Sequence, residues 1–185
     1  MSIKKWNISK ESTLFKKGMI NITEMESIRE QDNKKGVFYR FNFTDWVNVI
    51  PVTSDGKLLL VKQWRHGTED ISIEIPGGLS DPDELPEESA IRELREETGY
   101  TSEDWIYLGA VRPNPAIQTN KCHIYLALDA KLTDKTDFDP DEELETLEIS
   151  FEEADIWVSE GRITNAITLA AFSLLKSKYA GRGIK

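Results

Sequence analysis

Three glutamates on one turn of a predicted helix are the residues of this sequence best suited to chemistry. Glu93, Glu96 and Glu97 are spaced i, i+3 and i+4, which places their carboxylates on one helical face. Like charges at this spacing destabilise a helix. The chain of 185 residues already carries a formal net charge of −10. The cluster is therefore either a solvated face balanced by basic neighbours or a site that binds a cation.

Both interpretations have support in the residue types. Arg92 can pair with Glu88 and with Glu96 at helical spacing, and runs of charge are usually solvated faces. Carboxylate oxygens on a rigid element are also what Mg²⁺ prefers, and Mg²⁺ usually joins one or two carboxylates to substrate phosphates. A bound divalent ion would relieve the repulsion within the cluster.

The helix that carries the cluster has clear ends. Pro86 suits its first turn, and Gly99 suits the residue just past its last turn. Ala90, Ile91 and Leu94 form its apolar side. The spacing therefore predicts an amphipathic helix between residues 86 and 98.

Strands are predicted on both sides of this helix. Ser54-Asp55-Gly56 is a strong hairpin signal, and Pro51 before it weakens a strand or marks a bulge. Ser150 opens a capping box for a short helix. The expected strands are 37–43, 46–52, 57–63, 71–75, 105–111 and 123–128, with a short strand at 14–15, a charged turn at 32–36, an acidic loop at 134–145 and a last helix at 164–178. This order predicts a mixed fold, either α+β or an α/β sandwich.

Composition limits the remaining possibilities. Hydrophobic residues make up 39% and charged residues 30%, as in ordinary globular domains. There is no run of about 18 apolar residues, so no membrane span is expected, and the N-terminus lacks the apolar part of a secretory signal. Cys122 is the only cysteine, which excludes an internal disulfide. We expect a cytoplasmic protein that does not bind nucleic acid non-specifically, because such binding needs Lys and Arg to neutralise phosphates.

The stretch from Gly78 to Tyr100 resembles the signature of the Nudix hydrolases, and residues 78–100 are called the box below. Five residues separate Gly78 from Glu84, and seven more precede Arg92-Glu93-Leu94-Arg95-Glu96-Glu97-Thr98-Gly99-Tyr100. Seven specified residues make a chance match on the order of 10⁻⁸ per start point. Tyr100 replaces a more usual aliphatic residue at a position that needs only bulk.

The resemblance implies a fold, an activity and a metal site. The fold is an α+β, Nudix-type α/β/α sandwich with a mixed sheet between helices, and the activity is hydrolysis of a nucleoside diphosphate linked to another group with Mg²⁺ or Mn²⁺. Arg92 would orient a glutamate of the box, and Glu84 would support the loop. The implied metal ligands are Glu93, Glu96, Glu97 and the carbonyl of Gly77, with Arg92 and Glu96 also acting in catalysis, Gly78 allowing a tight turn and Gly99 closing the helix.

Residues 37–178 are similar to the ADP-ribose and nucleotide-sugar pyrophosphatase subgroup of this family. The similarity lies in Gln63-Trp64-Arg65-His66, in Ile73-Glu74-Ile75-Pro76-Gly77-Gly78, in Pro115 sixteen residues after Gly99, and in the region from Ser150 to the last helix. It implies substrate contacts by Arg65, Trp46 and Pro115. A surface ion pair is the alternative for Arg65, and core packing is the alternative for Trp46.

The subgroup also implies a catalytic base and a partner. Its base is often a glutamate on a loop before the last strand, here Glu142 or Glu143, although an acidic run is also commonly just solvated. Residues 1–45 would form an N-terminal strand module that makes a homodimer, and residues 46–185 the Nudix domain. The expected substrate is a small nucleotide sugar. A coenzyme A or dinucleoside polyphosphate hydrolase and a non-catalytic Nudix domain that senses a ligand are the alternatives.

Overall fold

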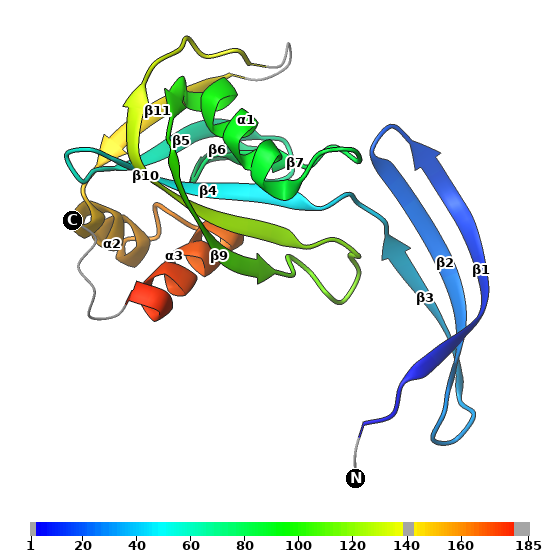
Figure 1. The fold of residues 1–185 in the computed structure, drawn as a ribbon. Coiled ribbons are helices and arrows are strands. Elements are labelled where there is room, and N and C mark those ends of the chain that lie inside the picture. The colour runs from blue at the N-terminus through cyan, green and yellow to red at the C-terminus, as the bar shows by residue number, and fades with distance from the viewer. Residues whose placement is uncertain (1–2, 139–142, 180–185) are drawn as a thin grey trace. The chain divides into compact units, whose positions relative to one another are not determined.

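The computed structural model describes residues 3–138 and 143–179, which belong to two compact units (Figure 1). The N-terminal unit contains residues 1–44 and 112–120. The main unit contains residues 45–111 and 121–185. Within the described residues, no helix is long and apolar enough to cross a membrane.

The N-terminal unit is a three-stranded antiparallel sheet in the order β1-β2-β3. Its strands are β1 (Trp6–Lys17), β2 (Ile20–Arg29) and β3 (Lys35–Phe41). The sequence predicted β3 and only a fragment of β1. Almost every residue of β1 is exposed, so the alternation that a half-buried strand displays is missing from its sequence.

The main unit is built on a mixed sheet. Its strands are β4 (Trp46–Thr53), β5 (Leu58–Arg65), β6 (Asp70–Glu74), β7 (Gly77–Leu79), β8 (Tyr100–Thr101), β9 (Asp104–Val111), β10 (Cys122–Leu132) and β11 (Leu144–Ile149). The main path runs β11-β5-β4-β10-β8, with β6 beside β5, β7 beside β4 and β9 beside β10. Strands β4 and β10 are parallel, and the other pairs are antiparallel.

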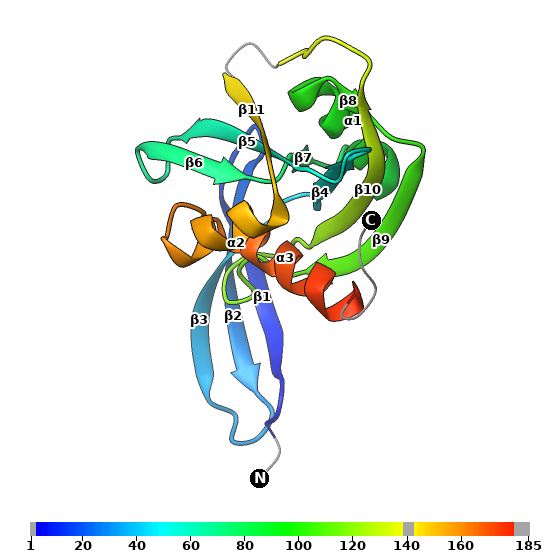
Figure 2. The same ribbon diagram turned by 90° about the vertical axis from the view of Figure 1, so that its left-hand side faces the viewer.

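Helices cover both faces of this sheet, as Figures 1 and 2 show. Helix α1 (Pro86–Thr98) packs Ala90 and Leu94 against Val47 and Val49 of β4. On the other face, α2 (Phe151–Ser159) and α3 (Ala166–Tyr179) cover the larger core. Strand β4 is therefore buried on both sides, which explains its nearly continuous apolar sequence.

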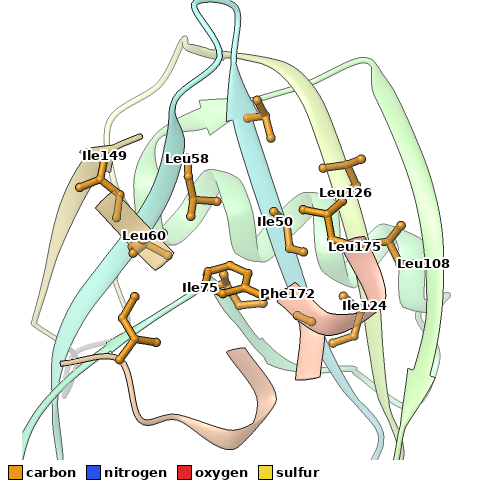
Figure 3. Close-up of a cluster of buried hydrophobic side chains, with 14 of the residues drawn as sticks. Ile50, Leu58, Leu60, Ile75, Leu108, Ile124, Leu126, Ile149, Phe172 and Leu175 are labelled. Atoms are coloured by element: carbon orange, nitrogen blue, oxygen red, sulfur yellow. The ribbon is translucent and has the colours of Figure 1, made fainter. Parts of the chain in front are cut away.

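The larger core lies on the face of the sheet opposite α1 (Figure 3). Ile50 of β4 and Ile124 of β10 meet Phe172 and Leu175 of α3 there. Ile75 is also in this core, 1% exposed, just before the box. Burial of these side chains, including Ile75, stabilises the segment that leads into the box.

Several local predictions are confirmed, and one is corrected. Antiparallel pairing of Val52 with Leu58 makes the hairpin, and Pro51 lies in β4 just before a register shift in its pairing with β10. The side chain of Ser150 caps α2 by accepting from the N–H of Glu153 at 3.0 Å. The acidic loop ends earlier than expected, because Glu145 belongs to β11 and pairs with Lys62.

Candidate active site

The ends of α1 are fixed by the residues that the sequence indicated. Pro86 is its first residue. The backbone N–H of Leu85 donates to the Glu88 carboxylate at 2.9 Å, so Glu88 caps the helix and is not the partner of Arg92 that we expected. Gly99 ends the helix at φ 73°, a left-handed conformation that glycine adopts at no steric cost.

Two glycines before α1 allow the backbone to approach the glutamates closely. A side-chain carbon at Gly78 would lie 2.5 Å from a carboxylate oxygen of Glu93, and one at Gly77 would collide with the carbonyl of Val47. The N–H of Gly77 donates to the Glu97 carboxylate at 2.8 Å. Any larger side chain at Gly78 would displace the Glu93 carboxylate, so this glycine leaves room for that group. The sequence had assigned it to a tight turn.

Arg92 joins the glutamates of the box. Its Nη1 atom contacts oxygens of both Glu93 and Glu96, at 2.9 and 3.1 Å. Its Nε and Nη2 atoms contact Glu84 at 3.0 to 3.3 Å, and Nη2 also donates to the carbonyl of Leu79 at 3.2 Å. These bonds, above all those with Glu84, raise the pKa of Arg92 and lower the pKa of the Glu84 carboxyl.

The donor set fits a hard divalent cation in its chemistry. Glu93, Glu96 and Glu97 supply carboxylate oxygens from one rigid helix, and Glu97 is only 4% exposed. Arg92 already places one positive charge between Glu93 and Glu96. Among the residues that the structure describes, no three acidic, His or Cys side chains are gathered closely enough to hold an ion as they stand. Arg92 occupies oxygens that a metal would use.

Comparison with known proteins assigns the family. A model described as "NUDIX domain" matches residues 43–172. The chain belongs to the Nudix family. A protein named "ADP-ribose pyrophosphatase" from Bacillus subtilis (strain 168) is 36% identical over 135 residues, which cover 72% of this chain and 73% of that protein. "Methanol dehydrogenase activator" from Bacillus methanolicus is 33% identical over 135 residues, with the same coverage of both chains.

A solved structure shares the fold. "Crystal structure of ADP compounds hydrolase" matches with a TM-score of 0.87 and 23% identity, covering 99% of this chain and 98% of that chain. The match confirms the α+β Nudix-type fold, with its mixed sheet between helices and its N-terminal strands. At this identity it is evidence for the fold alone.

Two predicted substrate residues lie near the Nudix box in the main unit. Arg65 makes a two-bonded ion pair with Glu74, at 3.0 and 2.9 Å, and Glu74 is 4% exposed. Glu74 ends β6 three residues before Gly77, so this pair holds the strand that leads into the box. Trp46 is half-buried, packs against the larger core and pairs in register with Leu79 of β7.

The other predicted residues lie outside this cluster. Pro115 is exposed in the N-terminal unit, in the turn where the N–H of Gln118 donates to the carbonyl of Asn114. Glu143 is exposed and directly precedes β11. Glu142 lies outside the described residues.

The sequence interpretation missed the polar residues whose hydrogen bonds hold the box in place. Ser89 is fully buried and donates to Glu84 at 2.8 Å, and its hydroxyl lies 2.9 Å from that of Ser80. The available signal was a serine at the fourth position of α1, where the apolar side of the helix begins. Asn48 is a second such residue, a polar side chain between two buried valines of β4.

Replacement of Arg92 tests its role in the Nudix box. We expect Arg92→Ala to lower the free energy of unfolding by about 2–3 kcal/mol, because three carboxylates lose their shared cation. This is less than for a fully buried pair, since the Arg92 side chain is 28% exposed. The control is Arg95→Ala, which removes a single 3.4 Å contact with Glu96 and should cost less than about 1 kcal/mol. Urea unfolding measures both.

The same variant has a predicted pH dependence. The pKa of Glu84 is lowered from its ordinary 4.5 by Arg92, so the pair stabilises the folded state above that pH. Its contribution is lost as pH falls through the lowered pKa. The difference between the native chain and Arg92→Ala should therefore be full at pH 7 and shrink below pH 4.5. Equal losses for Arg92→Ala and Arg95→Ala at pH 7 would contradict this role.

Proposed function

We propose that this chain hydrolyses the diphosphate bond of ADP-ribose or a related nucleoside diphosphate sugar. The products are a nucleoside monophosphate and a sugar phosphate, AMP and ribose 5-phosphate from ADP-ribose. The observation that carries the proposal is the box geometry, in which Arg92 contacts Glu93 and Glu96, Gly77 bonds Glu97, and Gly78 leaves room for Glu93. The substrate class rests on the relative from Bacillus subtilis, whose printed name is "ADP-ribose pyrophosphatase".

Glu93, Glu96 and Glu97, with the carbonyl of Gly77, would hold Mg²⁺ or Mn²⁺. Such an ion would supply charge to screen the diphosphate and to activate a water. The chain's own residues prepare the site. The Gly77 N–H fixes one oxygen of Glu97, and Arg92 orients Glu93 and Glu96 while Glu84 anchors its guanidinium. This arrangement keeps several negative side chains next to a site for a negative substrate.

Arg65 and Trp46 are proposed to contact the substrate near the box, and Pro115 is proposed as a further substrate contact. The guanidinium of Arg65 is partly exposed, at 46% for its side chain, while its bonds to Glu74 fix its direction. A fixed guanidinium suits a phosphate or a ribose hydroxyl. Its ion pair with Glu74 is compatible with that use, because it pre-organises the side chain.

The alternatives predict different results. A coenzyme A or dinucleoside polyphosphate hydrolase would use the same box on another substrate. A ligand-sensing Nudix domain needs no metal ligands, whereas this box keeps Glu93, Glu96 and Glu97. A turnover screen over ADP-ribose, GDP-mannose, UDP-glucose, coenzyme A, dinucleotides and nucleoside triphosphates, with Mg²⁺ and with Mn²⁺, separates these functions. Preference for triphosphates or dinucleotides would overturn the proposed substrate class.

The N-terminal unit is proposed to form a homodimer. Its strands and the turn between β1 and β2 expose large apolar side chains, which mark interaction surfaces when they form a patch. These side chains include Leu14, Phe15, Met19, Val37, Phe38 and Tyr39. Residues 1–44 also carry nine Lys and Arg against five Asp and Glu, although the whole chain has a net charge of −10. A basic, apolar sheet is complementary to the acidic remainder of a second copy.

Deletion of residues 1–42 tests the dimer. We expect a monomer or an aggregate with little activity, because the apolar and basic surface is removed. Deletion of residues 1–4, which precede β1, is the control and should leave a dimer. Light scattering coupled to size exclusion measures the mass. A 1–42 deletion that is monomeric, soluble and fully active would show that the segment is dispensable.

A further inference from the structure

The backbone just before the box lies outside the regular strands, but its N–H and carbonyl groups are hydrogen-bonded. Ile75 and Pro76 lie between β6 and β7 and belong to neither strand, although both are buried. The N–H of Ile75 donates to the hydroxyl of Thr168 on α3 at 3.2 Å. The carbonyl of Pro76 accepts from the N–H of Val49 at 2.9 Å. A buried segment outside regular structure needs such bonds, because an unpaired buried backbone group is costly.

Asn48 supplies the bonds that the sheet does not. Its Nδ2 atom donates to the carbonyls of Ile75 and Pro76, at 3.3 and 3.2 Å. The same amide packs against Gly77, where an added side-chain carbon would lie 2.5 Å from Nδ2. One side chain of β4 therefore contacts three consecutive residues that lead into the box. The last of them, Gly77, donates to Glu97.

Cys122 bonds the other end of this amide and matches its direction. Its Sγ atom donates to Oδ1 of Asn48 at 3.1 Å, so the oxygen points to β10 and the NH₂ group points to the two carbonyls. Cys122 is fully buried, and burial raises the pKa of its thiol to about 12. The thiol therefore stays protonated at neutral pH and remains a donor.

We propose that Asn48, held by Cys122, is a positioning residue for the metal site of the box. It fixes the Ile75–Gly77 backbone, and the Gly77 N–H in turn fixes the Glu97 carboxylate. This inference rests on the proposed function, since it assumes that Glu97 binds the metal. The effect of Asn48 on Glu97 passes through this backbone segment.

Binding of Mn²⁺ without substrate tests the proposal, with the free Mn²⁺ signal measured by electron paramagnetic resonance. We expect Asn48→Ala to weaken Mn²⁺ binding about 10–100-fold, the usual effect of residues that orient metal ligands. Leu108→Ala is the control, because Leu108 is 1% exposed in the larger core and lies outside the Asn48 network. It should lower Tm and leave the Kd for Mn²⁺ unchanged.

A second pair of variants tests the thiol and covers the case in which Asn48→Ala does not fold. Cys122→Ala should weaken Mn²⁺ binding to a smaller extent, and Cys122→Ser should restore it, because a hydroxyl still donates to Oδ1. If the native chain binds Mn²⁺ and the Asn48 and Cys122 variants bind it equally well, the positioning role is overturned and the proposed function stands. If the native chain does not bind Mn²⁺, the metal site itself is overturned, and the inference with it.

Discussion

Glu97→Gln is expected to lower kcat by at least about 100-fold, while the protein stays folded. Replacement of residues that only support metal ligands already lowers metal affinity or activity about 10–100-fold. Glu97 is proposed as a ligand itself. Glutamine keeps a side-chain oxygen that can accept from the Gly77 N–H, so the 2.8 Å bond that holds the loop is preserved. The substitution therefore removes the negative charge and leaves the local structure in place. Steady-state kinetics and thermal unfolding are the two measurements.

A glutamate elsewhere on the same helix provides the control. Glu87 is exposed on the first turn of α1, and Glu87→Gln removes the same charge from the same element. It should leave kcat within about twofold, since exposed surface substitutions rarely have larger effects. If Glu97→Gln retains near-native kcat with a native melting curve, Glu97 is not a ligand and its carboxylate serves only to hold Gly77.

Replacement of the catalytic base is expected to have the other large effect on kcat. If a loop glutamate activates the water, then Glu142→Gln or Glu143→Gln should lower kcat about 10²–10⁴-fold with little change in KM. The fall in kcat without a change in KM arises because a base acts in the transition state and adds little to ground-state binding. Measurement of both variants separately identifies the residue.

The described residues on each side of this loop are bonded to α1 and to β5. The N–H of Asp137 donates to the carbonyl of Glu96 at 2.9 Å, so the chain entering the loop is bonded to α1. After the loop, Leu144 pairs with Gln63 near the end of β5 that carries Arg65. Both anchors therefore lie close to residues of the proposed site.

Glu145→Gln is the matched control for the loop. Glu145 is in β11 and bonds Lys62 at 2.9 Å, so it is an acidic neighbour held by a surface ion pair. Its replacement should leave kcat unchanged. Near-native kcat in both Glu142→Gln and Glu143→Gln would show that the loop is only solvated and that the base is another residue.

Much of the main unit could be predicted because its signals are local. Pro86 and Gly99 delimit α1, Ser54-Asp55-Gly56 makes the hairpin, and Ser150 caps α2. Strand β1 could not be predicted, because a strand with both faces exposed has no alternating pattern. Likewise, nothing in the local sequence of residues 134–145 marks where β11 begins, since its start is set by pairing with β5.

The candidate site was predictable in its residue types and less so in its contacts. The i,i+4 spacing correctly predicted the pair of Arg92 and Glu96, but Glu84 comes from a loop whose path the spacing does not define. The pairing of Arg65 with Glu74 and the bonds of Asn48 depend on the register of β4, β5 and β6. Contacts of this kind arise from tertiary packing and leave no periodic trace in the sequence.

The most direct test is to incubate the protein with ADP-ribose and to identify the products by chromatography, with Mg²⁺ and then with excess EDTA. We expect AMP and ribose 5-phosphate in equal amounts with Mg²⁺, no turnover in EDTA, and recovery when Mg²⁺ or Mn²⁺ is restored. Full turnover in EDTA would contradict a metal site at Glu93, Glu96 and Glu97. Failure to release a nucleoside monophosphate from ADP-ribose or any nucleoside diphosphate sugar would contradict the proposed reaction.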